Sequence, residues 1–573
     1  MGFDCAVIGG GLGGSVTAMA LARSGLSVLV LEARSHPRFA IGESLVPTTS
    51  YGLRTLARVY GIPEIDDVSH FLGLEEIGCA GYPKQGFWFG VHRDGTPLQW
   101  AEQSLFLSPG LPLGPDVHML RSDVDAYLAG RLASHGVEYR DLSPVTRIDF
   151  ADDGVLLHIE GNETFRARFL VDASGPGSPL ARQLGLRLED PGMHTHSRAL
   201  FSHFADVPTL EETLDRTAPI MVTNRDTCTI HHCFDGGWSW FIRFATGVVS
   251  VGIMLDGNRP WPGEDGRADD EPPEREFWRV VERFPTIAAG LRGARMIRPM
   301  IRTPRVQYRN RTCFGDRFAI LPHASAFIDP LFSTGLNLTQ AFIRRLVPTL
   351  VQALDEDRLD AERFADIGQV FEDELAAVDL LVASTYASFR DFDVFKQTWR
   401  AFSYASVLQY LCQASEAAVP QAPYVGLYGA RVPLFRRLLA RIHDEVTRRD
   451  VEARVVAERL SAMWQDVAEP FPKDTTHWEL DADEPCVPDQ SKGVAVNPWF
   501  TSLRDDSQLL TEQTRLERLD ELLQAADLRA RELAQKADDS RASGGTFHRV
   551  LEFIENSRQY ASRRAATPPD PIG

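Results

Sequence analysis

A short segment near residue 10 has the glycine spacing that binds the pyrophosphate of a dinucleotide. It reads G-x-G-x-x-G, with glycines at Gly9, Gly11 and Gly14. An apolar run, residues 4–9, leads into the glycines, and an Ala- and Leu-rich stretch, residues 15–24, follows them. Glycines let the backbone approach the phosphates, and the free N–H groups at the start of a helix attract them. A second apolar run, residues 27–31, ends in Glu32, whose carboxylate can accept hydrogen bonds from the adenosine ribose. The segment predicts a dinucleotide-binding unit.

One lysine stands where an amine could take part in chemistry. Only five of the 60 basic residues are lysines. Lys84 follows Pro83 and precedes the aromatic run Phe87–Phe89, so we expect it at the entry to a strand with its side chain pointing inward. Burial lowers the pKa of a lysine and frees a nucleophilic or hydrogen-bonding amine. The alternative is an ordinary surface lysine.

Two tryptophans have the spacing of one strand face. Trp238 and Trp240 alternate with Ser239 and Phe241. Successive side chains of a strand point to opposite faces, so both indoles should lie on the same face. They either wall a reaction channel or belong to a hydrophobic core.

Potential metal ligands gather in a neighbouring segment. Cys228, His231, His232 and Cys233 lie within six residues of each other. A zinc site needs four ligands that converge tetrahedrally, and no second cluster supplies the rest. We therefore expect an ordinary strand here and no metal site.

Composition and charge exclude several classes of function. The chain of 573 residues has a net charge of −19, which argues against binding to nucleic acids or anionic membranes, because both need a basic surface. We find no apolar run of about 18 residues that would span a membrane, and residues 1–6 do not resemble a signal peptide. The seven cysteines are scattered and odd in number, which favours a reducing compartment, so we expect a cytoplasmic protein.

The elements that must position these residues alternate between strand-like and helical patterns. Strands are expected at residues 87–91, 154–160, 168–172, 238–244, 248–255 and 318–321. A helical pattern begins at residue 337, and residues 360–465 are predominantly helical. The expected fold class is α/β, with a Rossmann-like nucleotide-binding domain, an inserted α+β substrate domain and a helical C-terminal region.

The expected domain boundaries follow from these patterns. The nucleotide-binding domain comprises residues 1–80, 118–190 and 305–360, the substrate-domain sheet comprises 81–117 and 191–304, and the helical domain comprises 361–478. A linker at 479–500, a helix at 501–545 and a tail at 546–573, whose Pro-rich end at 567–573 is expected to be disordered, complete the prediction. Leu and Ala recur along residues 504–538 at coiled-coil spacing, so this helix packs either on its own subunit or in a homodimer.

Further segments resemble the flavin monooxygenase superfamily. Gly315-Asp316 before a strand and the turn at residues 329–335 after it resemble the second FAD fingerprint of that superfamily. Residues 171–175 resemble the strand and turn that close the same domain, and residues 36–44 resemble the matching segment of flavin-dependent halogenases.

Two motifs are specific to halogenases. Lys84 ahead of an aromatic-rich strand matches one of them, and Trp238-Ser-Trp240-Phe-Ile242 after a glycine matches the other. The likeness covers most of residues 1–430 and is closest to the phenol-type branch, which chlorinates phloroglucinol-like and tetracycline-like aromatics. Arg243 departs from the family, which has proline there, and Phe332 replaces the glutamate of tryptophan halogenases, which argues against a tryptophan substrate.

The resemblance implies FAD, used as FADH2, together with O2 and chloride or bromide. The implied FAD-binding residues are Gly9, Gly11, Gly14, Glu32, Arg38, Ser44, Arg121, Asp316 at the ribityl chain, and Gly335. The implied halide-binding residues are Ser333, Thr334 and Gly335, whose backbone N–H groups would form an anion nest at the start of a helix. The implied catalytic residues are Lys84, Trp238 and Trp240.

The family reaction gives each of these catalytic residues a task. FADH2 and O2 oxidise the halide to hypohalous acid, which Lys84 then holds by a hydrogen bond or as a chloramine. Trp238 and Trp240 wall the flavin off from the aromatic substrate, and electrophilic substitution follows. A base that deprotonates the substrate is not identified, since His92, His118, His323 and Glu43 are candidates only by neighbourhood.

The resemblance also implies partners. No second G-x-G-x-x-G unit for NAD(P)H is found, so a separate flavin reductase is expected to supply FADH2. The substrate would be a small phenolic aromatic of secondary metabolism, such as antibiotic biosynthesis, either free or tethered to a carrier protein. The alternatives are an FAD-dependent aromatic hydroxylase, which would not need Lys84 or the two tryptophans, and a non-catalytic FAD-binding protein.

Overall fold

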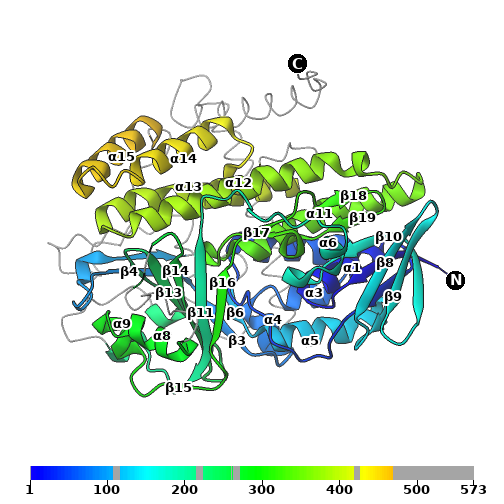
Figure 1. The fold of residues 1–573 in the computed structure, drawn as a ribbon, viewed down its shortest axis with the longest axis horizontal. Helices are drawn as coiled ribbons and strands as arrows, with labels where there is room; N and C mark the ends of the chain where they lie inside the picture. Colours follow the sequence, from blue (N-terminus) through cyan, green and yellow to red (C-terminus); the bar gives the residue numbers. More distant parts are fainter. Residues whose placement is uncertain are drawn as a thin grey trace.

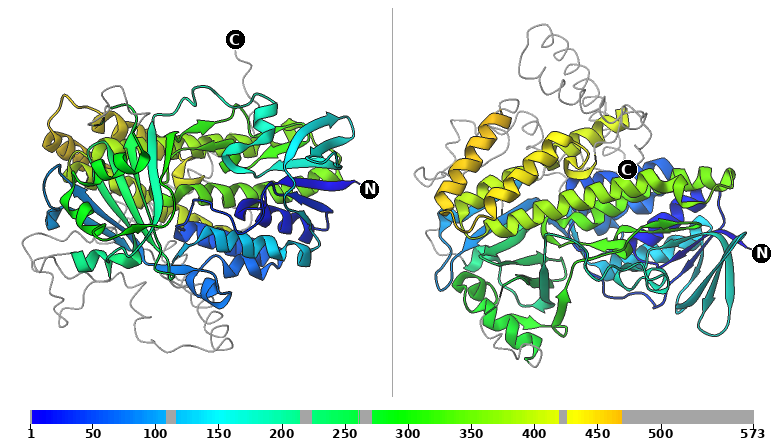
Figure 2. Two further views of the ribbon diagram at one scale, coloured as in Figure 1. Left: turned by 60° about the horizontal axis from the view of Figure 1, so that its bottom comes forward. Right: turned by 45° about the horizontal axis from the view of Figure 1, so that its top comes forward.

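Two eight-stranded sheets and a layer of long helices make up the structure (Figure 1). The computed structural model describes residues 2–107, 116–213, 224–259, 261, 271–418 and 426–468. Figure 1 shows the first sheet near the N-terminus and the second sheet at the other end of the molecule. The helices α11 (Thr334–Asp355), α12 (Ala365–Ser388) and α13 (Phe392–Ala418) lie along one side of both sheets (Figures 1 and 2).

The first sheet has a parallel core in the order β19-β10-β1-β2-β7. Its strands are β1 (Phe3–Ile8), β2 (Val28–Leu31), β7 (Glu138–Arg140), β8 (Val145–Ala151), β9 (Gly154–Ile159), β10 (Thr164–Asp172), β18 (Phe314–Gly315) and β19 (Phe318–Ile320). Val7 and Val30 pack toward the helices, whereas Ala6 and Leu31 pack toward the β8–β9 hairpin. Because β1 and β2 are covered on both faces, their sequences are continuous apolar runs rather than alternating ones.

One helix joins the first two strands of this sheet. The helix α1 (Leu12–Arg23) connects β1 to β2 and packs against both α5 (Arg121–Arg131) and α11. A Cβ placed at Gly13 of α1 would lie 3.1 Å from a side-chain atom of Thr339 in α11. The glycine motif and the first turns of α11 are therefore close neighbours.

The second sheet is mostly antiparallel, in the order β15-β11-β14-β13-β12-β4-β5, with β16 also paired to β11. Its strands are β4 (Gly86–His92), β5 (Gln103–Leu107), β11 (Ser197–Ala205), β12 (Cys228–Phe234), β13 (Gly237–Arg243), β14 (Val249–Asp256), β15 (Arg295–Met296) and β16 (Ile301–Arg305). One face packs on α8 (Pro273–Val281) and α9 (Pro285–Gly290), where Trp88 and Phe241 are buried. The other face carries Phe87, Trp238 and Trp240 into the main core.

A two-stranded ribbon lies between the two sheets. It consists of β3 (Gly81–Lys84) and β6 (Asp116–Met119), and Lys84 pairs with Asp116. The helices α2 (Pro47–Tyr60), α3 (Pro63–Asp67) and α4 (Phe71–Glu76) precede the ribbon, while α14 (Pro433–Val446) and α15 (Ala453–Ala468) pack on α12 and α13. Within the described residues, no helix combines the length and the apolar character needed to cross a bilayer.

The structure confirms the predicted fold class and the main elements. Each strand predicted from an apolar run is present within one residue at either end, except that β10 begins four residues earlier than predicted, at Thr164, and the helical pattern after residue 337 belongs to α11. The segment that contains Cys228 and Cys233 is strand β12, as expected. The predicted linker at 479–500, the helix at 501–545 with its 504–538 seam, and the tail at 546–573 lie outside the described residues.

Gly252 of β14 leaves room for the tryptophan face of the second sheet. A Cβ at this position would lie 2.2 Å from ring carbons of Trp240 and 2.6 Å from the Cβ of Phe201. We expect Gly252→Ala to lower the free energy of unfolding by about 1–3 kcal/mol, because the indole must move. Gly130→Ala is the control, since nothing lies within 4 Å of its Cβ position in α5, and it should be neutral or slightly stabilising. Equal denaturation midpoints for Gly252→Ala and the wild type would contradict this packing.

Candidate active site

The glycine motif forms a cradle that tolerates no side chain at two positions. Gly9 has φ +102°, and a Cβ there would lie 2.8 Å from the carbonyl oxygen of Ala173. A Cβ at Gly14 would lie 1.9 Å from the carbonyl oxygen of Gly9. The tight turn brings the first N–H groups of α1 to the carboxyl edge of the parallel sheet, which is where open α/β sheets bind their ligands.

Glu32 and its neighbours line this cradle. The buried Glu32 carboxylate accepts hydrogen bonds from the Gly10 N–H (2.8 Å) and from Arg38 Nη2 (3.2 Å). Three polar atoms near this site have no hydrogen-bond partner among the described residues: His36 Nδ1, Arg38 Nε and Tyr139 Oη. Unpaired buried polar groups around a glycine cradle fit a dinucleotide, whose ribose and phosphate oxygens would complete their hydrogen bonds.

Arg121 is the first residue of α5, and Asp125 connects it to the start of α1. Its guanidinium donates to both oxygens of Asp125 (3.0 and 3.1 Å) and to the carbonyl of Ile41 (2.8 Å). Asp125 in turn accepts from the Leu12 N–H at 3.2 Å. Ser44 lies further along, where its hydroxyl is 3.0 Å from Thr229 Oγ1 in β12. The segment that contains Arg38 and Ser44 therefore bridges the first sheet and the second.

The structure corrects the prediction for Asp316. This residue lies in the turn between β18 and β19, is exposed, and accepts a hydrogen bond from the Ala361 N–H. In the parallel sheet the amino end of β19 is at the edge opposite Gly9, so Asp316 cannot reach the ribityl chain of an FAD bound at the carboxyl edge. The residues that follow the carboxyl end of β19 are Leu321 and the short helix α10 (Pro322–Ser325).

The turn before α11 has an unusual backbone. Phe332 and Ser333 have φ +67° and +54°, which non-glycine residues rarely adopt. Such strained conformations persist only where the surroundings impose them, and they concentrate at functional sites. A Cβ at Gly335 would lie 2.5 Å from His323 Nε2, so glycine is required there as well. We refer to residues Leu331–Gly335, which contain the three predicted halide-binding residues, as the halide turn.

Lys84 is completely buried at the end of β3. Its Nζ donates to the Leu45 carbonyl and lies 3.9 Å from the centroid of the Phe87 ring. Burial lowers the pKa of Lys84 to about 8, although the charge of Asp116 partly opposes this shift. About a tenth of this amine is therefore unprotonated at pH 7, far more than for a lysine with the ordinary pKa of 10.5.

Aromatic rings connect Lys84 to the halide turn. This aromatic cluster consists of Phe87, Phe89, His231, Phe332, Trp399 and Phe402, all of them buried. The Phe332 ring stacks on Phe402 at 4.2 Å, and Phe402 meets Phe87 at 5.9 Å. The rings thus form a continuous series of aromatic contacts between the halide turn and the lysine.

Two cluster residues were missed in the sequence. Trp399 and Phe402 belong to α13, far along the chain from Lys84. Together with Phe395 they recur at steps of four and three residues, which places them on one helix face. This spacing is the signal that could have found them, although it does not tell a reaction channel from a core.

The two predicted tryptophans lie on the cluster side of the second sheet. Trp238 stacks on His231 at 5.2 Å and meets Trp240 at 5.6 Å. Trp238 Nε1 donates to Tyr386 Oη (2.9 Å), and Trp240 Nε1 donates to Ser250 Oγ (3.2 Å). The structure thus brings Lys84, Trp238 and the halide turn around the aromatic cluster, whereas Trp240 contacts Trp238 from outside the cluster.

The histidines of β12 show why the potential ligand cluster does not converge. His231 faces the aromatic cluster, and its neighbour His232 faces Trp88 on the other side of the sheet. Within the described residues, no group of three His, Cys, Asp or Glu side chains is arranged to hold a metal ion.

The candidates for a substrate base are dispersed. Burial lowers the pKa of His92 to about 3 and that of His323 to about 4, and it lowers the pKa of His118 well below its usual value. Histidines with such low pKa values are weak bases. His92 is also bonded to His232 on the far face of the sheet, and Glu43 is paired with His203 at 2.9 Å.

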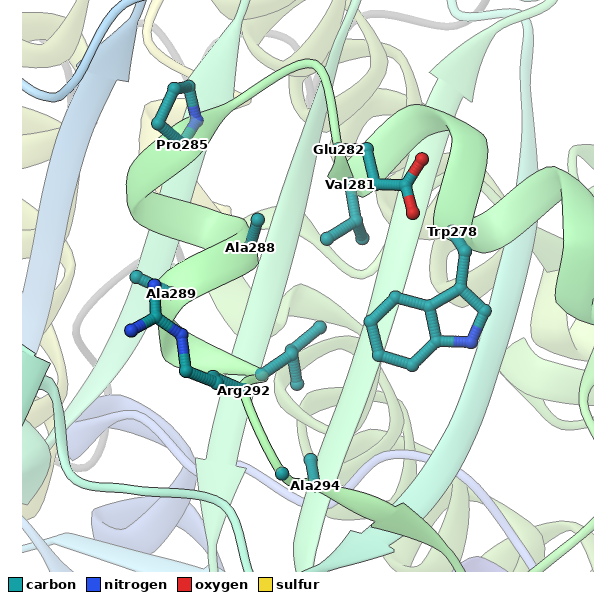
Figure 3. A pocket seen from close by; sticks show the side chains of 10 residues that line it. Trp278, Val281, Glu282, Pro285, Ala288, Ala289, Arg292 and Ala294 are labelled. Atoms are coloured by element: carbon teal, nitrogen blue, oxygen red, sulfur yellow. The ribbon is translucent and has the colours of Figure 1, made fainter.

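A surface cavity of about 580 Å³ lies on the α8–α9 side of the second sheet (Figure 3). Trp278, Pro285 and Arg292 are among its lining residues, and no predicted site residue lines it. Because α8 and α9 pack on the face that carries Trp88 and Phe241, this cavity is separated from Lys84 by the sheet.

Comparisons with known proteins identify the family. Residues 7–60 match the family model of an NAD(P)-binding Rossmann-like domain, and residues 112–419 match that of the tryptophan halogenases. The chain belongs to the flavin-dependent halogenases. The halogenase is 38% identical over 415 residues to tetracycline 7-halogenase from Kitasatospora aureofaciens, which covers 71% of this chain and 74% of that protein.

Two further relatives support the assignment. Monodechloroaminopyrrolnitrin halogenase PrnC from Pseudomonas fluorescens is 35% identical over 407 residues, 69% of this chain and 70% of its own. The crystal structure of halogenase PltM in complex with phloroglucinol and FAD has a TM-score of 0.74 and 29% identity, covering 81% of this halogenase and 96% of that chain. The predicted family, its enzymatic nature and its flavin cofactor are confirmed.

Arg243 has a structural role that explains its departure from the family proline. Its guanidinium donates to the buried Asp226 carboxylate (2.6 Å), to the Val207 carbonyl (3.1 Å) and to the Pro208 carbonyl. Asp226 also accepts from the Leu210 N–H. The arginine therefore fastens the end of β13 to the segment before α7 (Leu210–Thr213).

Arg243→Ala should lower the free energy of unfolding by about 3 kcal/mol, because it leaves the buried Asp226 carboxylate without its cation. Arg147→Ala is the control, since it breaks the exposed pair with Asp149 and should cost under about 1 kcal/mol. Urea denaturation of both variants measures the difference. If the two variants unfold at the same urea concentration, Arg243 does not stabilise β13.

Proposed function

We propose that this halogenase chlorinates or brominates an electron-rich phenolic aromatic, and that the Lys84 amine transfers the halogen. The observation that carries the proposal is the complete burial of Lys84 against Phe87, in an aromatic cluster that extends to Phe332 of the halide turn. The bound FADH2, with O2, would supply the two-electron oxidation of halide to hypohalous acid. The other steps depend on residues of this chain.

The halide turn would hold the halide. Thr334 and Gly335 open α11, whose first N–H groups have no intrahelical acceptors and attract anions, whereas the N–H of the preceding Ser333 already donates to the Pro330 carbonyl (3.0 Å). Thr334 is buried, so a halide at this turn would lose most of its hydration and become a better nucleophile. Phe332 contributes an apolar ring to the turn and stacks on Phe402.

Lys84 would receive the hypohalous acid at the other end of the cluster. An unprotonated amine can form an N–Cl bond from HOCl with release of water, and the aromatic carbon then takes the chlorine while its proton returns to nitrogen. A protonated amine can instead hold HOCl by a hydrogen bond. Both routes need an amine that is screened from bulk water, and the lowered pKa of Lys84 supports the first.

The relatives support an aromatic substrate. The first relative is named for a tetracycline and the PltM structure contains phloroglucinol, both of them phenolic. Two more distant relatives act on pyrrole-2-carbonyl groups carried by a peptidyl carrier protein, so carrier tethering is the alternative mode of delivery. A phenol or phenolate needs little activation toward electrophilic chlorine, which is consistent with the lowered pKa values of His92, His118 and His323.

The remaining parts of the proposal concern partners and location. FADH2 would come from a separate reductase, the product would belong to secondary metabolism, and the protein would work in the cytoplasm. Five of the cysteines are described, and all five are free thiols, which fits a reducing compartment. The homodimer stays an alternative to the monomer.

Lys84→Ala should abolish aromatic halogenation while FAD binding and FADH2 oxidation stay within about twofold of wild type, because the flavin contacts lie in other segments. Lys84→Arg should fail as well, since a guanidinium stays protonated. Lys396→Ala is the control, because this half-exposed lysine pairs with Asp393. Halogenated phenol is measured by mass spectrometry, and O2 uptake is followed in parallel. Substantial product from Lys84→Ala would refute the assigned role.

The titration of Lys84 should also be visible in stability. Its pKa is lowered from 10.5 to about 8, so between these pH values the unfolded chain binds a proton that the folded protein does not. The contribution of Lys84 to the free energy of unfolding should therefore rise with pH across this window and stay constant below pH 8. Lys84→Met should lack the rise. If the free energies of unfolding of the wild type and Lys84→Met change in parallel with pH, the lowered pKa of Lys84 is wrong.

A further inference from the structure

A buried carboxylate precedes the halide turn and has not been given a role so far. Asp329 is almost completely buried, and none of the described residues forms an ion pair with it. Its Oδ2 accepts hydrogen bonds from Ser197 Oγ (2.7 Å) and Tyr386 Oη (2.9 Å), and its Oδ1 accepts from the Leu331 N–H (3.0 Å). A carboxylate that only neutral groups stabilise is costly to bury, so its position needs an explanation.

One branch of this network reaches the tryptophan face of the second sheet. Trp238 Nε1 donates to Tyr386 Oη at 2.9 Å. An indole N–H can only donate and an ionised carboxylate can only accept, so the phenol proton of Tyr386 must point to Asp329. Burial beside Asp329 raises the pKa of Tyr386 well above its usual value, which keeps that proton in place. The orientation of the Trp238 indole is thus set by Asp329 through Tyr386.

The other branch holds the halide turn. Asp329 accepts a hydrogen bond from the Leu331 N–H. Leu331 directly precedes Phe332 and Ser333, the two residues of the turn with positive φ. Gln307 holds Ser197, the residue whose hydroxyl donates to Asp329. The Gln307 Nε2 donates to Ser197 Oγ and to the Ile328 carbonyl, both at 2.7 Å. These contacts fix the backbone on the amino-terminal side of the strained residues and so contribute to imposing their conformation.

We infer that Asp329 is a positioning residue that couples the halide turn to the Trp238 wall, so that halide binding and the path of hypohalous acid to Lys84 are set by one carboxylate. This inference rests on the proposed function of the site. The raised pKa of Asp329, about 6, agrees with a carboxylate held by neutral donors in a dry interior. If the indole were free to turn, hypohalous acid would escape from the cluster instead of reaching the lysine.

Tyr386→Phe tests the branch to Trp238. The variant keeps the ring and the bond from the Leu331 N–H to Asp329, but it removes the acceptor of the indole N–H. We expect FADH2 oxidation and bromide affinity within about twofold of wild type, and about a tenfold loss of halogenated product per FADH2 oxidised, with free hypobromous acid appearing in a solution trap. Tyr127→Phe is the matched control, since it removes a similar Tyr-to-Asp bond (2.9 Å to Asp67) away from the site.

Asp329→Asn tests both branches together. A carboxylate has two accepting oxygens, but an amide has only one, and its NH2 group can only donate. The variant therefore cannot accept from the hydroxyls of Ser197 and Tyr386 and from the Leu331 N–H as the carboxylate does. We expect bromide affinity, measured from the absorbance of FAD bound to the protein, to fall about tenfold, in addition to the loss of coupling seen for Tyr386→Phe. Unchanged bromide affinity together with unchanged product yield would overturn the inference.

A spectroscopic readout separates this inference from the proposed function. In protein labelled with ¹⁵N-tryptophan, Tyr386→Phe and Asp329→Asn should both shift the indole N–H resonance assigned by Trp238→Phe, whereas Tyr127→Phe should leave it in place. A wild-type protein that makes no halogenated product refutes the proposed function, yet the resonance and the bromide affinity still decide the coupling. An unshifted Trp238 resonance in both variants refutes the coupling even if the wild type halogenates.

Discussion

Removing the Lys84 amine from water is the constraint on which the rest of the site depends. A buried ammonium is costly unless a carboxylate compensates it; here Nζ contacts a carbonyl and the face of Phe87, and the charge of Asp116 compensates it only in part. The protein therefore keeps the amine at a pKa of about 8. Only a rigid surround can maintain this environment, because a loosened structure would admit water and restore an ordinary lysine. The β3–β6 ribbon and the rings of β4 and α13 provide that rigidity.

The same dry interior explains why the C-terminal helices belong to the site. In the proposed reaction, hypohalous acid must pass from the halide turn to Lys84 without being lost to solvent, so the space between them needs a lining that excludes water. Phe332, Phe402 and Trp399 form that lining, and two of the three come from α13. The first sheet places the halide turn, the second sheet places Phe87 and Trp238, and α13 closes the space between them.

Local patterns in the sequence predicted the glycine cradle, Glu32, the strand face of Trp238 and Trp240, and the burial of Lys84, because each depends on neighbours within a few residues. Asp316 was placed wrongly because a Gly-Asp pair beside a strand does not reveal at which end of the strand it lies, whereas the parallel pairing of β19 with β10 does. Trp399, Tyr386 and Asp329 could not be assigned for a different reason. Their roles arise from contacts between segments that are far apart in the chain, and spacing within one helix does not disclose them.

The wall strand β13 shows how these long-range contacts work together. At the Trp238 end, Tyr386 connects the strand to the Asp329 carboxylate, and at the other end Arg243 connects it to the Asp226 carboxylate. The halogenase motif places proline after Ile242, which stiffens the chain but donates no hydrogen bond. Arginine at this position loses the stiff ring and gains three anchoring contacts instead. The strand proposed to separate flavin from substrate is therefore held at both ends by buried acids, and its two indoles lie between them.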